Sequence, residues 1–175
     1  MDMFEVCIYG NPVLRKKAEA VTEFNDELKG FVEEMAETMK IQDGVGLAAP
    51  QVSKSLRIAV IDTTGGEQEP YILINPEIIH SSEEREDFEE GCLSIPDIRL
   101  KVNRPLKVSI KAFDAEGREY SIENAEGLLA RALQHEIDHL DGVLFIDRAS
   151  PVARQLVSGK LKKMAKSQKI KNKTV

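Results

Sequence analysis

The segment 134–140, with the sequence QHEIDHL, places two histidines four residues apart and a glutamate directly after the first. On a helix this spacing is just over one turn, so the rings of His135 and His139 lie on one face and converge. Such a pair can bind a metal ion, with Glu136 beside it as a proton carrier. A catalytic metal usually takes three protein ligands and one water, so the segment predicts a metal hydrolase with one further ligand elsewhere.

The third ligand can be sought by elimination along the chain. One class of HExxH proteases uses a histidine six residues after the second, where this chain has Phe145. Another class uses a downstream glutamate, but no glutamate follows Glu136. Asp141 and Asp147 lie too close to the end of the helix. The upstream candidates are His80, Cys7 and Cys92.

Cys92 is the best of these candidates. It stands in EEGCLSIP, where Gly91 and Pro96 are typical of a shaped loop. Cys7 alternates with apolar residues in FEVCIY and is expected to be a small buried side chain. A thiolate with two imidazoles suits Zn²⁺ or Fe²⁺ and leaves a fourth position for water. We therefore predict a metal held by Cys92 and the two histidines.

The composition is that of an ordinary globular protein. A length of 175 residues fits one compact domain, and 42% hydrophobic and 31% charged residues are typical values. No apolar run is long enough for a transmembrane helix, and the N-terminus has neither a secretory nor a transit pattern. We expect a cytoplasmic protein without membrane association.

Charge is distributed unevenly along the chain. The net charge of −6 argues against DNA binding, and the run SSEEREDFEE (81–90) holds six acids and one arginine. No acid follows Asp147, whereas Arg154 and seven lysines lie between 154 and 173. Such a basic segment is commonly a solvated helix, but it can also contact phosphate groups of RNA.

Three helices are expected. Asn25 is a suitable N-cap for a first helix, which ends before the glycine-containing loop QDGVGLAAPQ. The segment 124–142 should form one buried helix, capped by Asn124 and ended by Gly142 in a left-handed turn. A helix in the basic segment should bury an apolar stripe of Val152, Leu156, Val157, Leu161 and Met164.

Strand patterns come before the HExxH helix. RIAVID and YILIN are expected to be short strands joined by a Gly-Gly turn, and PLKVSIKAF with REYSIE a hairpin. We therefore predict an α+β fold, with antiparallel or mixed sheets wrapped around a central HExxH helix, an N-terminal helix and a C-terminal helix. Residues 1–150 should form one catalytic metallohydrolase domain, and 151–175 a basic C-terminal helix or tail.

Three segments together resemble the motifs of bacterial peptide deformylase: GVGLAAPQV (44–52), EGCLSIP (90–96) and QHEIDHLDG (134–142). They occur in the family's order and at roughly its spacing, and the resemblance spans nearly the whole chain. It implies an enzyme that removes the formyl group from the N-terminal formyl-methionine of nascent polypeptides. It also implies the family fold, in which sheets surround the HExxH helix.

The resemblance implies a metal and a mechanism. The three predicted ligands would hold one Fe²⁺ ion per chain, with Zn²⁺, Ni²⁺ or Co²⁺ as substitutes. Metal-bound hydroxide would attack the formyl carbonyl, with Glu136 as general acid and base. The side-chain amide of Gln51 and the backbone N–H of Leu93 match the family's oxyanion donors.

Substrate-binding residues follow from the same resemblance. Val45, Gly46 and Gly91 would line the channel and bind the substrate main chain. Arg131 is charged where some members carry an aliphatic residue, which leaves the width of the pocket open; its stem could line the site with its head in water. Arg99 matches a basic residue near the substrate. The implied methionine pocket consists of Val45, Phe88, Glu90, Leu128, Arg131, Ala132 and His135.

Two other functions are compatible with parts of the sequence. A small zinc endopeptidase shares HExxH but usually lacks a cysteine ligand. A non-catalytic ribosome-associated binding protein should have lost Gln51, Cys92 or Glu136, and this chain keeps all three. For a deformylase, which acts on emerging chains, the basic tail suggests contact with the ribosome through its RNA.

Overall fold

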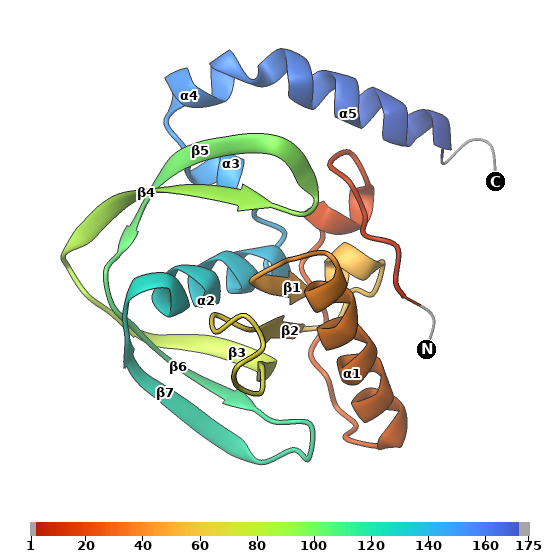
Figure 1. The fold of residues 1–175 in the computed structure, drawn as a ribbon, viewed down its shortest axis with the longest axis vertical. Helices are drawn as coiled ribbons and strands as arrows, with labels where there is room; N and C mark the ends of the chain where they lie inside the picture. Colours follow the sequence, from red (N-terminus) through yellow and green to blue (C-terminus); the bar gives the residue numbers. More distant parts are fainter. Residues whose placement is uncertain (1–2, 172–175) are drawn as a thin grey trace.

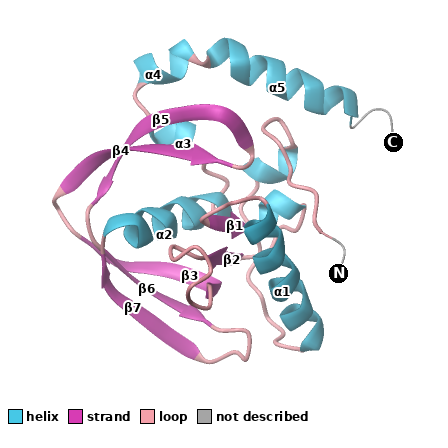
Figure 2. Cartoon of the chain, viewed as in Figure 1, coloured by secondary structure: helices cyan, strands magenta, loops and turns pink. Residues whose placement is uncertain are grey.

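The computed structural model describes residues 3–171, so residues 1–2 and 172–175, including Lys173 of the basic tail, lie outside the described residues. One helix, α2 (Gly127–Leu140), lies between two antiparallel sheets (Figure 1). Figure 2 shows strands on both sides of this helix. The larger sheet has the order β1-β2-β3-β6-β7. Its strands are β1 (Gly46–Ala48), β2 (Ile58–Ile61), β3 (Tyr71–Ser81), β6 (Val108–Phe113) and β7 (Glu119–Ala125). The predicted α+β class with sheets around the HExxH helix is confirmed.

The smaller sheet is a long hairpin of β4 (Arg85–Cys92) and β5 (Ile95–Pro105). Neither strand was predicted from the sequence, in which the first of these segments is conspicuous only as an acidic run. Every second residue of β5 from Ile98 to Arg104 is buried, and β4 pairs with that strand in register, Phe88 opposite Val102. Strand formation here follows from pairing with β5 rather than from the local composition of β4.

The central helix is buried on most of its surface. Leu133, Ile137 and Leu140 pack against apolar residues of the larger sheet, such as Ile61 and Ile110. Apolar contacts on several sides leave the helix little freedom to move, so α2 holds its side chains in fixed positions relative to the sheet.

The N-terminal end of α2 differs from the prediction, whereas its C-terminal end agrees with it. The helix starts at Gly127 with Glu126 as its N-cap, so the expected cap at Asn124 is wrong. Asn124 belongs to β7, where its backbone N–H donates to Ser109 Oγ at 2.9 Å. Asn124 is therefore part of the strand and cannot serve as the first residue of the helix. At the other end Gly142 has φ +73°, which confirms the predicted left-handed exit.

The first helix, α1 (Asp26–Ile41), covers the other part of the core. The side chain of Asn25 accepts from the backbone N–H of Leu28 at 3.0 Å, as expected of an N-cap. Met35 and Met39 are fully buried in a second apolar cluster that includes residues of β2 and β3. Short 3-10 helices lie at Pro12–Arg15 and Ala49–Val52.

The C-terminal part forms three helices, α3 (Phe145–Arg148), α4 (Pro151–Leu156) and α5 (Ser158–Lys171). The last two lie along one side of the molecule, beyond the β4–β5 hairpin (Figure 1). Leu161 is 4% exposed, but Val152 and Leu156 are 72% and 82% exposed. The predicted stripe is thus only partly buried, because the helix breaks at Val157. None of the described helices is long and apolar enough to cross a membrane.

The exit of α2 gives a test of the backbone geometry. A Cβ added at Gly142 would lie 2.6 Å from the carbonyl oxygen of Arg15, in a left-handed conformation. Gly142→Ala should therefore lower the free energy of unfolding by roughly 1–3 kcal/mol. Gly30→Ala is the matched control inside α1, where a Cβ meets nothing within 4 Å. It should raise stability by about 0.5–1 kcal/mol. Urea denaturation followed by circular dichroism measures both, and equal stabilities for the two variants would contradict this assignment.

Candidate metal centre and active site

Three side chains from two elements converge on one point. One donor atom each from Cys92, His135 and His139 lies within 4.8 Å of the other two. The Sγ atom of Cys92, at the end of β4, is 3.3 Å from Nε2 of His139 on α2. One sulfur and two imidazole nitrogens form a donor set that suits Zn²⁺ or Fe²⁺ and leaves room for a fourth ligand. These residues fit a metal ion.

The other upstream candidates do not belong to this cluster. His80 lies exposed on β3, paired in register with Ser109. Cys7 is buried, as expected, with its Sγ 2.9 Å from Ser53 Oγ. The choice of Cys92 among the candidates agrees with the cluster that the structure brings together.

His135 is oriented by its neighbours. Its Nδ1 lies 2.9 Å from Oε1 of Glu90, and its ring stacks against Phe145 with 6.0 Å between centroids. An ionised carboxylate can only accept, so Nδ1 carries the hydrogen and Nε2 is left for the cluster. This arrangement, with a carboxylate behind a ligating imidazole, is common at metal sites and fixes the tautomer of the ring.

The two histidines differ in protonation. Burial lowers the pKa of His139 well below its usual value, so the ring is neutral and able to donate an electron pair to a metal. Burial also acts to lower the pKa of His135, but hydrogen bonds with Cys92 and Glu90 outweigh it and raise that pKa well above the usual value. Metal binding at this cluster should therefore release a proton.

Glu136 points away from solvent beside the cluster. It is 4% exposed, and its Oε2 has no hydrogen-bond partner among the described residues. Burial raises the pKa of this carboxyl to about 7, and the charge of Glu90 acts in the same direction. Its carboxylate occupies the space in which a Cβ of Gly46 would lie. The structure thus gives Gly46 a role that the sequence did not predict, namely room for Glu136.

Gln51 is held with its amide nitrogen toward the cluster. Its Oε1 accepts from the backbone N–H of Ala48 at 2.9 Å. Its Nε2 donates to Ser94 Oγ at 3.1 Å and lies 3.5 Å from Sγ of Cys92. Since the oxygen is occupied by Ala48, the amide cannot flip without losing these contacts. Ser94, fully buried in the turn after β4, was missed by the sequence analysis.

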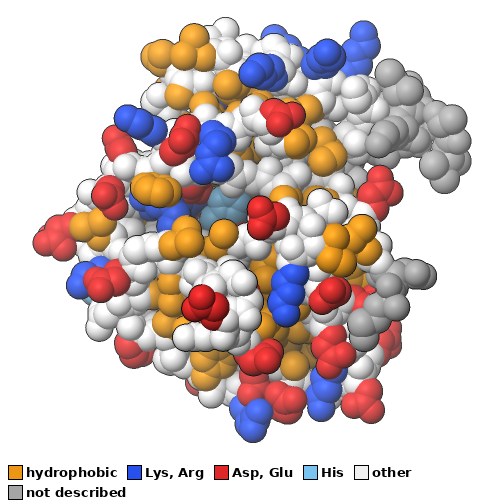
Figure 3. All heavy atoms as spheres, viewed as in Figure 1, with side chains coloured by type: hydrophobic (Ala, Val, Ile, Leu, Met, Phe, Trp, Pro, Cys, Tyr) orange, Lys and Arg blue, Asp and Glu red, His pale blue; other side chains and the backbone are white. Residues whose placement is uncertain are grey.

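A cavity of about 490 Å³ opens onto the cluster. Figure 3 shows histidine atoms at the bottom of a hollow in this face. Of the predicted site residues only His139 is not part of the cavity wall, and Arg99 also lines it. The predicted residues that line the cavity are Val45, Gly46, Gln51, Phe88, Glu90, Gly91, Cys92, Leu93, Leu128, Arg131, Ala132, His135 and Glu136.

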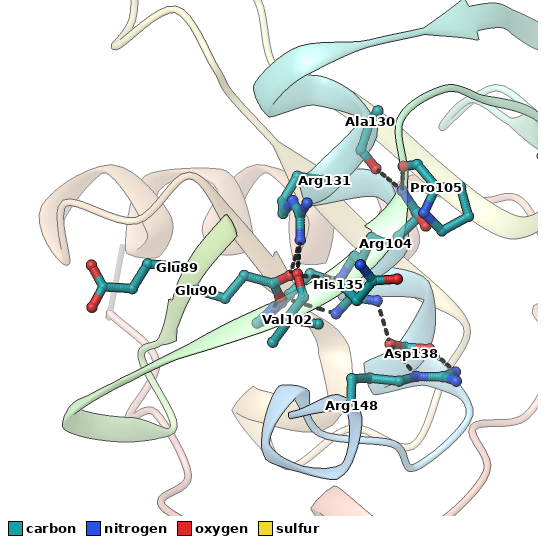
Figure 4. A network of polar contacts seen from close by, with 12 residues as sticks. Glu89, Glu90, Val102, Arg104, Pro105, Ala130, Arg131, His135, Asp138 and Arg148 are labelled. Atoms are coloured by element: carbon teal, nitrogen blue, oxygen red, sulfur yellow. Dashed lines mark hydrogen bonds and ion pairs between the residues drawn. The ribbon is translucent and has the colours of Figure 1, made fainter. Parts of the chain in front are cut away.

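The head of Arg131 is buried, and the expectation that it lies in water is wrong. The side chain is 11% exposed, and Nη1 donates to Oε2 of Glu90 at 3.0 Å and to the carbonyl of Val102 at 2.7 Å. Its Nη2 donates to the carbonyl of Glu86 at 2.9 Å. The β4–β5 hairpin, which the sequence did not predict, supplies all three acceptors, of which Figure 4 shows Glu90 and Val102.

A second arginine completes this polar network. Arg104 donates to both oxygens of Glu90, at 2.7 and 3.0 Å, and to Asp138 at 2.8 Å (Figure 4). Asp138 in turn accepts from Arg148 of α3. Burial alone would raise the pKa of Glu90, but hydrogen bonds from His135 and Arg104 lower it to about 2. The Glu90 carboxylate therefore stays ionised. Arg104 and Asp138 carried no recognisable signal in the sequence.

The family model for polypeptide deformylase matches residues 3–155. A peptide deformylase of Brucella suis is 47% identical over 94% of this chain and 95% of its own length. The crystal structure of the Thermotoga maritima peptide deformylase matches with a TM-score of 0.82 and 47% identity, over 86% of this chain and 100% of that one. The crystal structure of the Plasmodium falciparum peptide deformylase matches with a TM-score of 0.90 and 38% identity, over 95% of this chain and 98% of that one.

The comparisons and the geometry agree. A donor set of one cysteine and two histidines lies at the cavity in the fold that these deformylases share, and the similarity extends over nearly the whole chain. This chain therefore belongs to the peptide deformylase family, enzymes that remove the N-formyl group from nascent polypeptides.

Proposed function

We propose that Cys92, His135 and His139 hold one divalent metal ion, which serves the removal of the formyl group from formyl-methionyl nascent peptides. The observation that carries this proposal is the convergence of their donor atoms within 4.8 Å at the cavity. The ion would be Fe²⁺, with Zn²⁺, Ni²⁺ or Co²⁺ as substitutes, since a thiolate with two imidazoles accommodates each of them. When bound, the ion acts as a Lewis acid and acidifies a water molecule.

Glu136 accepts a proton in the reaction and passes it to the leaving amine. Its carboxylate is buried beside the cluster and has one oxygen without a hydrogen-bond partner among the described atoms. A carboxylate placed in this way can exchange protons with a small molecule inside the cavity rather than with bulk water. General acid–base catalysis of this kind contributes roughly 10²–10⁴-fold in rate.

Gln51 and Leu93 stabilise the oxyanion that develops on the formyl group. The amide of Gln51 is fixed by Ala48 and Ser94, and Leu93 follows directly after Cys92 in the cavity wall. Donors that are in place before the reaction need no reorganisation when charge develops, and removing one costs roughly 3–4 kcal/mol in comparable sites.

The methionine side chain binds against apolar residues of the cavity. Val45, Phe88 and Leu128 line it and are 39%, 52% and 48% exposed, although large apolar side chains are normally covered. Ala132 adds a small apolar surface on α2. The backbones of Val45, Gly46 and Gly91 bind the substrate main chain. Glu90 and Arg131 support this wall from behind, and Arg99 lies at the mouth, beside Glu89.

A formyl-Met peptide and casein distinguish this function from that of a zinc endopeptidase. The metal-loaded protein should release formate from the formyl peptide and leave casein intact, because the proposed contacts place the formyl group of an N-terminal residue, not an internal peptide bond, at the metal. Formate release and gel electrophoresis measure the two activities. Casein cleavage with an untouched formyl peptide would favour the endopeptidase, and inactivity toward both would favour a binding protein.

Substitutions separate the metal ligands from the proton carrier. Glu136→Gln should lower kcat by about 100-fold or more and keep one ion per chain, because it removes the proton acceptor only. Cys92→Ala should lose the metal as well. Cys7→Ala is the matched control, since this cysteine lies outside the cluster, and it should keep both metal and activity. Elemental analysis of anaerobically purified protein gives the metal content. A metal-free Glu136→Gln protein would contradict these roles.

We also propose that residues 1–150 are the catalytic unit, acting in the cytoplasm, and that the basic tail (residues 151–175) contacts the ribosome. Four lysines of α5 are exposed, namely Lys160, Lys162, Lys163 and Lys166. No acidic residue follows Asp147 in the sequence, so nothing within the tail neutralises them. Cations in this arrangement can replace counterions along RNA phosphates. Leu161 on the same helix packs into the core, so charge removal is a cleaner test than truncation.

Replacing these four exposed lysines by glutamine should weaken ribosome co-sedimentation about tenfold or more at low salt, and it should reduce the salt dependence. Turnover of a small formyl peptide should not change, because the cavity lies elsewhere. A control variant with Lys16, Lys17, Lys40 and Lys54 replaced by glutamine has the same net charge and should sediment as the parent does. Equal sedimentation of the two variants would rule out a specific role of the tail.

A further inference from the structure

One side chain connects the substrate pocket with the polar network behind it. Arg131 reaches from α2 to three alternate residues of β4: the carbonyl of Glu86, the ring of Phe88 and the carboxylate of Glu90. It also donates to the carbonyl of Val102, the residue opposite Phe88 on β5. One guanidinium on the central helix therefore contacts both strands of the hairpin.

The guanidinium itself is held rigidly. It makes three hydrogen bonds of 2.7 to 3.0 Å in a side chain that is 11% exposed. A planar fork with several fixed donors suits such divergent acceptors, whereas the single ammonium of lysine cannot reach all of them. Backbone carbonyls and a carboxylate thus set the position of this charge. A ring that rests on the guanidinium has little freedom to move.

The ring of Phe88 rests on this guanidinium. The distance from Cζ of Arg131 to the ring centroid is 5.5 Å, within the range of a cation–π interaction. Phe88 is 52% exposed, so core packing does not fix its ring. It lines the cavity together with Leu128 and Ala132, which lie on α2 beside Arg131. The position of this wall therefore depends on the contact with Arg131.

We propose that Arg131 is a positioning residue for substrate selectivity: it holds the Phe88 ring as a fixed wall, and so limits the width of the pocket that receives the first side chain. This inference rests on the proposed function of the cavity. An unbranched side chain such as that of methionine fits beside a fixed wall, whereas a bulkier one requires the ring to move. Arg131 does not touch the reacting atoms.

The metal cluster should be largely independent of this effect. Glu90, the partner of His135, keeps both hydrogen bonds from Arg104 when Arg131 is replaced. Loss of Arg131 should therefore change the pocket and leave the metal content nearly unchanged. A merely structural role would instead lower thermal stability without altering the preference between substrates.

The test is a double-mutant cycle on substrate selectivity. The measured quantity is the ratio of kcat/KM for a formyl-Met peptide to that for the matching formyl-Phe peptide, with metal content and melting temperature recorded for each variant. Arg131→Lys and Arg131→Met should each lower this ratio about fivefold, mainly through a lower KM for the formyl-Phe peptide, because the released ring can move aside for the bulkier side chain. Phe88→Leu should lower it as well. Adding Arg131→Lys to Phe88→Leu should cause no further fall, because the ring it would release is absent.

The surface variant Arg118→Lys serves as the control, since Arg118 is exposed in the turn between β6 and β7 and should leave the ratio unchanged. Additive effects in the cycle, or an unchanged ratio in both Arg131 variants, would overturn the inference. Failure of the parent protein to deformylate either peptide would instead refute the proposed function.

A change on the ring itself avoids any folding defect of the arginine variants. Replacing the Phe88 ring with a trifluorinated phenylalanine keeps its shape and removes most of the negative charge on its face, so the attraction to Arg131 weakens. The selectivity ratio should again fall severalfold. A ratio equal to that of the parent would show that the cation does not hold the ring, and this result would overturn the inference even if the arginine variants were unstable.

Discussion

The carboxylate of Glu90 joins the two halves of the active site. It lies on the β4–β5 hairpin and accepts hydrogen bonds from Arg104, Arg131 and His135. Removing an ion from water costs several kcal/mol, and this cost is offset only when every oxygen is paired, as it is here. Three of the bonds in this network cross between the hairpin and α2, so the two elements keep one relative placement even when one of the bonds is lost.

That placement decides whether a metal site exists. Cys92 comes from the end of the hairpin, whereas both histidines come from the helix, and the network lies between the two elements. A buried ionic network is weak evidence for stability, since apolar residues of the same volume often serve as well. In this protein its benefit is geometric, because the donor atoms must meet within a few ångströms.

Local patterns in the sequence predicted what depends on local structure. The helix with two histidines, its exit at Gly142 and the cap at Asn25 each rest on residues a few positions apart, and the structure has all three. Cys92 was found by elimination and by the resemblance of its segment to a known motif. The Asn124 cap failed because β7 runs further than its own sequence indicates.

The unpredicted parts depend on partners far away in the chain. Glu90 and Arg131 are 41 positions apart, and no pattern in either segment announces the pair. The acid-rich segment 85–92 can be recognised as a strand only once its pairing with β5 is known. The role of Ser94 likewise depends on a distant residue, because it accepts a hydrogen bond from the amide of Gln51.

The close approach of Gly46 to Glu136 has a consequence for the design of inhibitors. The carboxylate of Glu136, the proposed proton carrier, fills the volume that any larger residue at position 46 would need. A compound that packs against this stretch of backbone would touch a position where added bulk displaces Glu136. If Glu136 carries the proton as proposed, drug resistance through a bulkier residue at this position would also lower the activity of the enzyme.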